Sequence, residues 1–325
     1  MKILFNAIGC GIGNNGSSLT IVNSANALVD LGHDVYIIDA GANQHTWTKL
    51  KCKHLKVSDI NKIPKADVAI TTGFNTCKRT LQFPAKIKVM WLRGWETWKI
   101  SEENIINNLL PLPLIKVVNG IGLQEKLKQH GHESYLIRPG HTFEDFSLKN
   151  IKKNNIVLGG LYHSKHSTKR HEWCINTYVT LKKKYPNLKL HMFGVTNTSN
   201  PNIDKYLQNP SKEEKNNFYN RVDIWLSPSI LEGLHITPAE AMLCETPVIT
   251  TNTLLAGTKD YVINGETGLI SKNNIKSFIN QTEVLIKNKE LRIEMGIKAR
   301  KKIIELGSRH DNMKLMVELF EGLIK

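Results

Sequence analysis

The stretch that decides the fold is residues 227–250, SPSILEGLHITPAEAMLCETPVIT. An apolar strand expected over 222–226 leads into it through a turn. Thr237-Pro238 then opens a helix, with threonine at the N-cap and proline at the first helical position. We expect this helix to end near Glu245, where another strand follows. A strand, loop, helix and strand in this order are typical of an α/β protein with a parallel sheet.

Two glutamates lie at the start of this helix. Glu232 precedes it on the loop and Glu240 stands on its first turn. Carboxylates accept hydrogen bonds and therefore suit the hydroxyls of a sugar or a ribose. Backbone N–H groups at a helix start, together with the helix dipole, suit a phosphate. A simpler interpretation stays open, in which Glu240 completes a capping box with Thr237 and Glu232 is an ordinary surface residue.

The same alternation of strands and helices extends in both directions along the 325 residues, a length that suits two α/β domains. Periodicity is lost over 138–150, which we interpret as the linker. We predict domains over 1–145 and 146–305, both Rossmann-like with parallel sheets, and a helix over 306–325 that returns to the first domain. Strands are expected at 2–8, 35–38, 67–71, 87–92, 115–118, 135–137, 155–158, 189–193, 222–226 and 247–250, and helices at 17–31, 172–184, 212–220 and about 275–325.

Composition limits the class of protein. The apolar runs are too short to span a bilayer, and the opening residues indicate a first strand and not a secretory signal, so a cytoplasmic protein is expected. The five cysteines are scattered, which argues against a zinc site. The net charge of +15 favours contact with anions such as nucleic acid, an acidic polymer or the inner membrane surface. A lysine-rich solvated surface explains the charge equally well.

Around the two glutamates the sequence resembles the family 4 retaining glycosyltransferases, whose fold is called GT-B. Their signature has a serine turn, Glu-Gly, a proline, Glu-Ala-Met and Pro-Val-Ile, with seven residues between the glutamates. A second stretch, Asn264-Gly265-Glu266-Thr267-Gly268, resembles the family's Asp/Asn-Gly-x-Thr-Gly. The matching residues of the first signature are Ser229, Glu232-Gly233, Pro238, Glu240-Ala241-Met242 and Pro247-Val248-Ile249.

The resemblance implies roles for particular residues. Glu232 is expected near the transferred sugar and Glu240 at the donor ribose. Lys169 matches a family lysine that neutralises the diphosphate, whereas the family arginine has no clean counterpart, because Gly160 occupies its place. The family's first-domain histidine is also missing, and Arg93 is nearest to its position. Catalytic roles are therefore expected for Glu232, Lys169 and Arg93, and donor binding for Glu240, Gly160, Lys165, Arg170 and the backbone of Gly233, Leu234, His235 and Ile236.

A competing motif lies in the first domain. Gly11, Gly13 and Gly16 follow a strand and precede a helix, and Asp39 ends the second strand. This is the fingerprint of dinucleotide binding, so an NAD-dependent oxidoreductase is an alternative. The oxidoreductase alternative gives no role to the two glutamates of residues 227–250. We favour a glycine-rich loop, through Gly13 and Gly16, that lets the backbone approach the donor or the acceptor.

The expected activity is therefore transfer of a hexose or pentose from a UDP- or GDP-sugar, with retention of configuration and without a cofactor or a required metal. The donor is expected mainly on the second domain and the acceptor on the first, across a central cleft. Two acceptor classes stay open. One is a lipid-linked or cell-surface glycan at an anionic membrane, and the other is DNA with a modified base, as in phage DNA glycosyltransferases.

Overall fold

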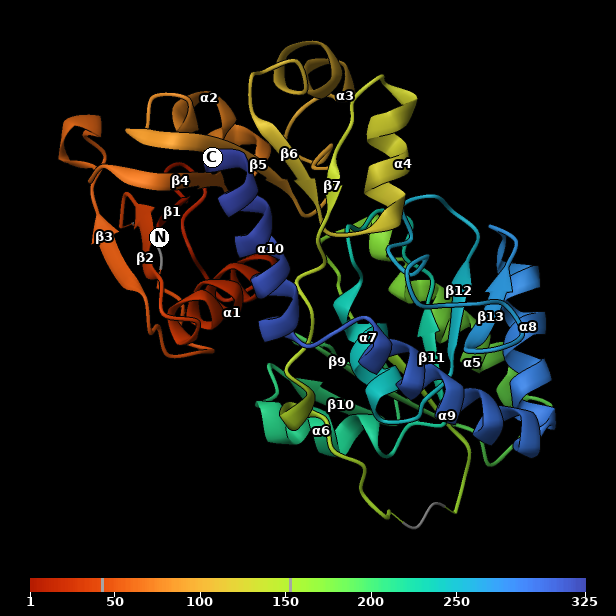
Figure 1. Cartoon of the computed structure of the whole chain (residues 1–325). Helices are drawn as coiled ribbons and strands as arrows, with labels where there is room; N and C mark the ends of the chain where they lie inside the picture. The colour runs from red at the N-terminus through yellow and green to blue at the C-terminus, as the bar shows by residue number, and fades with distance from the viewer. Residues whose placement is uncertain (42–43, 152–153) are drawn as a thin grey trace. The chain divides into compact units, whose positions relative to one another are not determined.

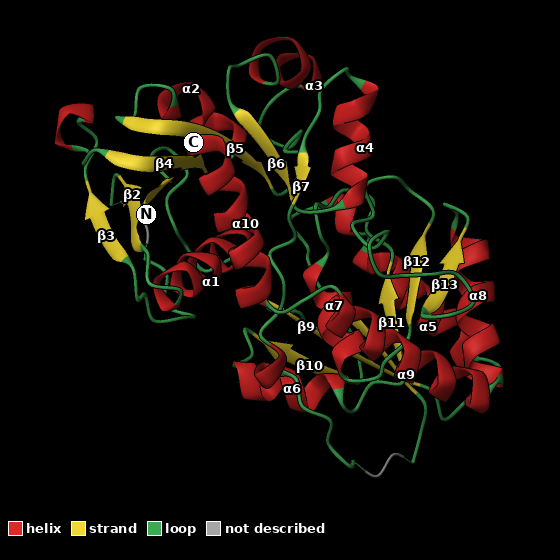
Figure 2. Cartoon of the chain, in the orientation of Figure 1, coloured by secondary structure: helices red, strands yellow, loops and turns green. Residues whose placement is uncertain are grey.

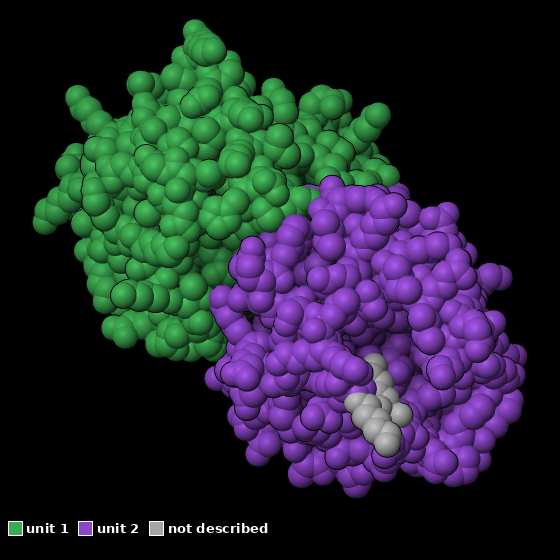
Figure 3. All heavy atoms as spheres, turned by 60° about the horizontal axis from the view of Figure 1, so that its bottom comes forward, with its two compact units in different colours: residues 1–140, 307–325 green, residues 141–306 purple. Residues whose placement is uncertain are grey.

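The computed structural model describes residues 1–41, 44–151 and 154–325. The chain divides into two compact units, which Figure 3 colours separately. The first unit consists of residues 1–140 and 307–325, and the second of residues 141–306. The chain therefore leaves the first unit at Gly140 and returns to it after Leu306. Each unit contains its own parallel sheet and its own hydrophobic core.

The first unit is built on a seven-stranded sheet with the order β3-β2-β1-β4-β5-β6-β7, in which all pairings are parallel. Strands β1 and β4, in the middle of this sheet, are almost entirely buried because helices cover both faces of the sheet. The strands are β1 (Lys2–Asn6), β2 (Asp34–Asp39), β3 (Lys53–Lys56), β4 (Ala66–Thr71), β5 (Ala85–Leu92), β6 (Ile115–Val118) and β7 (Tyr135–Leu136).

Helix α1 (Gly16–Asp30) packs on this sheet. Its N-cap is Asn15, whose side chain accepts the N–H of Ser18, and Gly32 follows its C-cap with a φ of 86°. Helix α10 (Arg309–Ile324) lies along α1, as Figure 1 shows, and adds Met316 and Phe320 to the same core. The remaining elements are η1 (Ile60–Lys62), η2 (Phe74–Thr76), α2 (Cys77–Thr80), α3 (Glu102–Asn104), η3 (Ile105–Leu109) and α4 (Ile121–Gln129).

The second unit has a six-stranded parallel sheet with the order β10-β9-β8-β11-β12-β13. Strand β8 lies between β9 and β11, so the loops that follow β8 and β11 leave the same edge of the sheet side by side. The strands are β8 (Val157–Leu161), β9 (Lys189–Gly194), β10 (Lys205–Gln208), β11 (Ile224–Ser227), β12 (Val248–Thr251) and β13 (Gly268–Ser271).

Helices cover both faces of this second sheet (Figure 2). One core contains residues of α6 and α7 with Ala299 and Ile303 of α9, and the other contains residues of α5 and α8 with Met295 of α9. The helices are η4 (Phe143–Asp145), η5 (Ser167–Lys169), α5 (His171–Lys182), α6 (Lys212–Tyr219), α7 (Ile236–Leu243), α8 (Ile275–Lys287) and α9 (Lys289–Glu305).

The structure confirms two α/β units with parallel sheets. Three strands were not predicted, namely β3, β10 and β13. All three lie at sheet edges, where a strand needs few apolar residues. The sequence of β3, KHLK, shows the reason, because its two lysines are exposed and no apolar run marks it.

None of the helices in residues 1–41, 44–151 and 154–325 is both long enough and apolar enough to cross a bilayer. Within the same ranges, no three His, Cys, Asp or Glu side chains are grouped so that they could hold a metal ion.

Candidate functional site

The loop between β11 and α7 carries most of the expected site. Strand β11 is fully buried and ends at Ser227, so the loop begins at the carboxyl edge of the sheet. This edge is where ligands bind in parallel α/β proteins. Three main-chain hydrogen bonds set the conformation of the loop: Ile230 N–H to Thr168 C=O (3.0 Å), Glu232 N–H to Leu255 C=O (2.7 Å) and His235 N–H to Gly257 C=O (2.8 Å).

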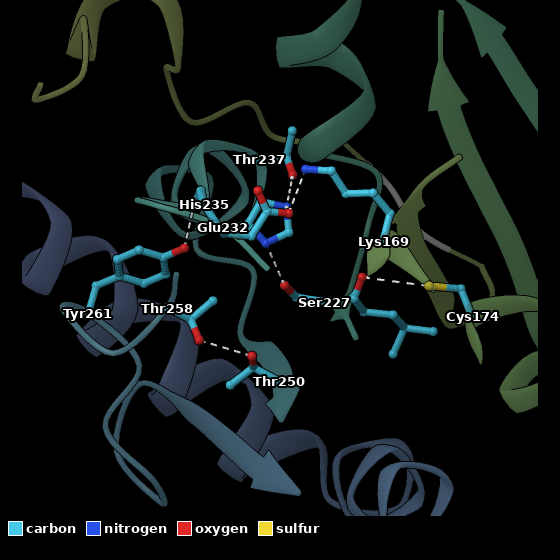
Figure 4. Close-up of polar contacts among 10 residues, drawn as sticks. Lys169, Cys174, Ser227, Glu232, His235, Thr237, Thr250, Thr258 and Tyr261 are labelled. Carbon is cyan, nitrogen blue, oxygen red and sulfur yellow. Dashed lines mark hydrogen bonds and ion pairs between the residues drawn. The ribbon is translucent and has the colours of Figure 1, made fainter. Parts of the chain in front are cut away.

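Lys169 and Glu232 form an ion pair at this edge. The Lys169 Nζ to Glu232 Oε1 distance is 2.6 Å, and the two side chains are only 22% and 11% exposed. Lys169 ends η5, which follows β8, and Glu232 follows the neighbouring strand β11. The parallel order of these strands therefore brings together two residues that are 63 positions apart in the sequence, as Figure 4 shows.

The charge of Glu232 is stabilised despite its burial. Burial alone would raise the pKa of this carboxyl group, but His235 and the Lys169 ammonium outweigh it, and the pKa of Glu232 lies below its usual range. Ser229 adds a hydrogen bond that acts in the same direction. Glu232 is therefore a carboxylate at neutral pH, with a cation beside it.

The side chain of His235 belongs to the same cluster, although the sequence predicted only a backbone role for this residue. Its Nδ1 lies 3.0 Å from the Ser227 hydroxyl, and its Nε2 lies 3.2 Å from the Thr237 hydroxyl and 3.5 Å from Glu232 Oε1. The ring is buried. No local sequence pattern points to these contacts, because the direct neighbours of His235 are Leu234 and Ile236 and Ser227 lies well before it in the sequence.

Glu240 does not form the expected capping box. Helix α7 begins at Ile236 with His235 at the N-cap, and the Thr237 hydroxyl contacts His235 instead of capping the helix. The Glu240 carboxylate turns toward α6, where it accepts hydrogen bonds from Tyr219 Oη (2.7 Å) and Lys215 Nζ (3.3 Å). The capping-box interpretation is therefore wrong, and Glu240 is a buried carboxylate that two side chains of α6 hold.

The other basic residues expected near the diphosphate differ in their surroundings. Lys165 is exposed, and among the described residues it has neither a hydrogen bond nor an ion pair. The guanidinium of Arg170 donates to Asn273 Oδ1 and stacks 4.5 Å from the Trp173 ring centre, so it is already held. Of these two residues, Lys165 is therefore the one whose charged group is accessible to an anionic ligand.

Gly160 has a packing role. It lies in β8 between β9 and β11, and a Cβ atom there would come within 3.1 Å of Cys174 Sγ. The structure therefore gives no support to the donor contact expected for Gly160.

At the start of α7, the N–H groups of Gly233 and Leu234 make no hydrogen bond within the described residues, whereas that of His235 is already bonded to Gly257.

Arg93 and the glycine-rich loop belong to the first unit. Arg93 donates to the Ser17 carbonyl (2.8 Å) and hydroxyl (2.7 Å) and to the Thr72 carbonyl, so much of its guanidinium is held by the protein. Gly16 begins α1. Gly13 is tied on both sides, because its N–H donates to Ser18 Oγ (3.1 Å) and its carbonyl lies 2.9 Å from His45 Nδ1.

Asp39, the acid of the dinucleotide fingerprint, is also held. Its buried carboxylate lies 2.8 Å from His54 Nε2 and accepts the Gly41 N–H at 2.6 Å. In dinucleotide-binding proteins this acid contacts a ribose. Here both carboxylate oxygens have partners within the protein.

Gly257 lies against the loop of Glu232, and its replacement by alanine should destabilise the protein. Its φ is 73°, and a Cβ atom would lie 2.5 Å from Glu232 Cβ and 2.9 Å from the His235 nitrogen. A non-glycine residue at this φ costs on the order of 1–3 kcal/mol. The steric overlap adds on the order of 1–3 kcal/mol. We expect Gly257→Ala to lower the Tm by at least about 4 °C in a thermal unfolding experiment.

Gly265→Ala is the matched control for this prediction. Gly265 has a similar φ of 82°, but no heavy atom lies within 4 Å of its would-be Cβ. Gly265→Ala carries the same kind of backbone strain but no steric overlap of the added Cβ atom, so it should lower the Tm less than Gly257→Ala does. Equal shifts of Tm in the two variants would contradict the close approach of Gly257 to the Glu232 loop.

Comparison with known proteins places these residues in a family. Residues 143–302 match the family of glycosyl transferases group 1. The capsular polysaccharide biosynthesis glycosyltransferase CapM of Staphylococcus aureus is 32% identical over 50% of this chain and 48% of CapM, so the match spans about half of that relative. An uncharacterized glycosyltransferase of Haemophilus influenzae is 24% identical over 95% of this chain and 96% of its own length.

Solved structures share the fold over the whole chain. Anabaena HepE in complex with UDP and glucose matches with a TM-score of 0.79 and 14% identity, covering 99% of this chain and 100% of HepE. The second-unit site residues, Lys169, Glu232, His235 and Glu240, all lie within the matched range 143–302. Residues 143–302 are therefore similar to glycosyl transferases group 1, and the chain shares the GT-B fold of its solved neighbours.

Proposed function

We propose that this protein transfers a sugar from a UDP-sugar to an acceptor hydroxyl, with retention of configuration. The observation that carries the proposal is the buried Lys169–Glu232 pair, together with the carboxylate of Glu240 that Tyr219 holds. The pair supports the proposal because it follows two neighbouring strands at the edge where parallel sheets bind ligands. The UDP and glucose bound by HepE support the choice of nucleotide.

Each group has a physical role in this proposal. As the glycosidic bond to the diphosphate breaks, negative charge grows on the leaving phosphate, and the fixed ammonium of Lys169 stabilises it. Lys165 and the free N–H groups of Gly233 and Leu234 add further donors for the phosphates. Glu232 lies next to the cation and faces the transferred sugar, whereas Glu240 accepts hydrogen bonds from the donor ribose.

We propose that the first unit binds the acceptor, through Arg93 and the loop that contains Gly13 and Gly16. The name of the CapM relative, which refers to capsular polysaccharide biosynthesis, favours a glycan acceptor. A guanidinium anchored at the Ser17 and Thr72 carbonyls is a fixed donor for the hydroxyl or acidic groups of such a chain.

Ligand-detected NMR with a panel of nucleotides tests this function directly. UDP-glucose, UDP-N-acetylglucosamine, GDP-mannose and NAD are added separately to the full chain, and saturation transfer to each is measured. We expect transfer to a UDP-sugar and none to NAD. Binding of NAD with no binding of any sugar nucleotide would reject the proposal in favour of the oxidoreductase.

Glu240→Gln tests the ribose contact in the same experiment. Glutamine keeps an acceptor for Tyr219 but loses the charge, and a hydrogen bond to a charged group is worth about 1.5–3 kcal/mol. The dissociation constant of the UDP-sugar should therefore rise about 10–100-fold. Glu213→Gln, which changes an exposed glutamate of α6, is the matched control. An unchanged dissociation constant in Glu240→Gln would remove Glu240 from the donor site.

A further inference from the structure

The main chain of His235 is clamped from two sides. Its N–H donates to the Gly257 carbonyl at 2.8 Å, and its own carbonyl accepts a hydrogen bond from Tyr261 Oη. His235 is the N-cap residue of α7, but its side chain caps no helical N–H group. The ring is therefore free to turn toward Ser227 and Glu232, as Figure 4 shows, while the backbone beneath it is fixed.

The neighbours of the ring determine which nitrogen carries the proton. Glu232 Oε1 lies 3.5 Å from Nε2, and a carboxylate can only accept. A lone pair on Nε2 would face this negative charge, so the Nε2–H tautomer is favoured. The Ser227 hydroxyl, 3.0 Å from Nδ1, then donates to the ring, and the Thr237 hydroxyl accepts from Nε2 at 3.2 Å.

The ring is neutral at physiological pH. Burial lowers the pKa of His235 to about 4, and Lys169 acts in the same direction, whereas Glu232 opposes both. These two side chains are the charged groups that act on the ring. The cation beside Glu232 is therefore Lys169, and His235 contributes an oriented N–H dipole.

We propose that His235 is a positioning residue for Glu232, and that Ser227 orients it in turn. The inference rests on the proposed role of Glu232 at the transferred sugar. Lys169 Nζ and His235 Nε2 approach the same oxygen, Oε1, from different segments of the chain. Lys169 bonds this oxygen at 2.6 Å, whereas the Nε2–H group, whose hydrogen bond goes to Thr237, faces it at 3.5 Å. The two groups together restrict the rotation of the carboxylate and so hold it in one orientation toward the substrate.

Kinetics of variants test this role. A misplacement of about 1 Å at a reacting group costs about 10²-fold in rate. His235→Ala should lower kcat by about 10–100-fold and change the KM of the UDP-sugar by less than about threefold. His235→Gln restores an N–H donor on a side chain of similar length and should recover most of the loss. Ser227→Ala, which removes the donor to Nδ1, should give a smaller loss of kcat.

His191→Gln is the matched control. His191 is a half-buried histidine of β9 in the same unit, with a pKa also lowered to about 4 by burial, and it packs against Phe218 away from this cluster. This variant should keep the wild-type kcat. A loss of kcat in His191→Gln as large as that in His235→Ala, or a normal kcat in His235→Ala, would overturn the proposal.

A spectroscopic readout keeps this proposal separate from the proposed activity. In 15N-labelled protein at pH 7, the ring of His235 should show a protonated Nε2 and an unprotonated Nδ1, and its shifts should move in Glu232→Gln. A protonated Nδ1, or ring shifts that are unchanged in Glu232→Gln, would reject the contact between His235 and Glu232 even if the enzyme is active. Absence of transfer from every UDP-sugar, with the ring shifts as expected, would instead reject only the proposed activity.

Discussion

Replacing Glu232 by glutamine should lower the rate of sugar transfer by about 10³-fold, close to the largest effect of removing one fixed electrostatic group from an active site. The variant keeps the size of the side chain and removes its charge. As the bond to the leaving diphosphate breaks, the sugar gains positive charge, which a fixed carboxylate stabilises and an amide does not. The measurement is release of UDP in the presence of acceptor, with saturating donor.

The loss of charge also affects the folded protein, and a double variant separates the two effects. Glu232→Gln leaves the Lys169 ammonium, 22% exposed, without its anionic partner, which should lower the Tm. Glu232→Gln combined with Lys169→Met removes both charges and should recover stability without recovering transfer. Glu266→Gln, at an exposed glutamate of the same unit, should change neither quantity. Transfer at the normal rate in Glu232→Gln would refute the role of this residue.

The family resemblance named Lys169 and Glu232 separately, one at the diphosphate and the other near the transferred sugar, and the structure pairs their side chains. Both residues follow strands of a parallel sheet, whose carboxyl ends meet at one edge. The sequence did not predict that β8 and β11 are neighbours, since the order of strands in a sheet leaves no local signal. The edge strands β3, β10 and β13 were missed for a related reason, because an edge strand needs little apolar periodicity.

The partners of Glu240 and the ring of His235 could not be predicted. The sequence left two interpretations of Glu240 open, a ribose contact and a capping box, since a Thr-x-x-Glu pattern is a real helix-start signal. The helix instead begins at Ile236, and Glu240 is held by Tyr219 from another helix. Contacts of this kind depend on how α6 and α7 pack on one face of the sheet, and neither helix encodes that packing alone.

Replacing Lys169 by methionine should lower kcat by about 10²-fold, because the charge that grows on the leaving diphosphate loses its fixed cation. The KM of the UDP-sugar should rise on the order of tenfold, since a charge-assisted contact to the bound donor is lost as well. Lys169→Arg keeps the charge and should retain more activity than Lys169→Met. Lys184→Met is the control, because Lys184 forms an exposed ion pair with Glu283 in the same unit.

The pH dependence of Lys169→Met gives a sharper test than the rate alone. Burial raises the pKa of Glu232, and Lys169 is one of the groups that hold it below its usual range. Without that cation the pKa must rise, so protonation of Glu232 should begin at a higher pH. The reaction requires the carboxylate, and the acid limb of the kcat profile should therefore move to higher pH in Lys169→Met and stay in place in Lys184→Met. An unmoved limb together with a reduced kcat would mean that Lys169 acts on the diphosphate alone, and that the charge of Glu232 is set by other groups.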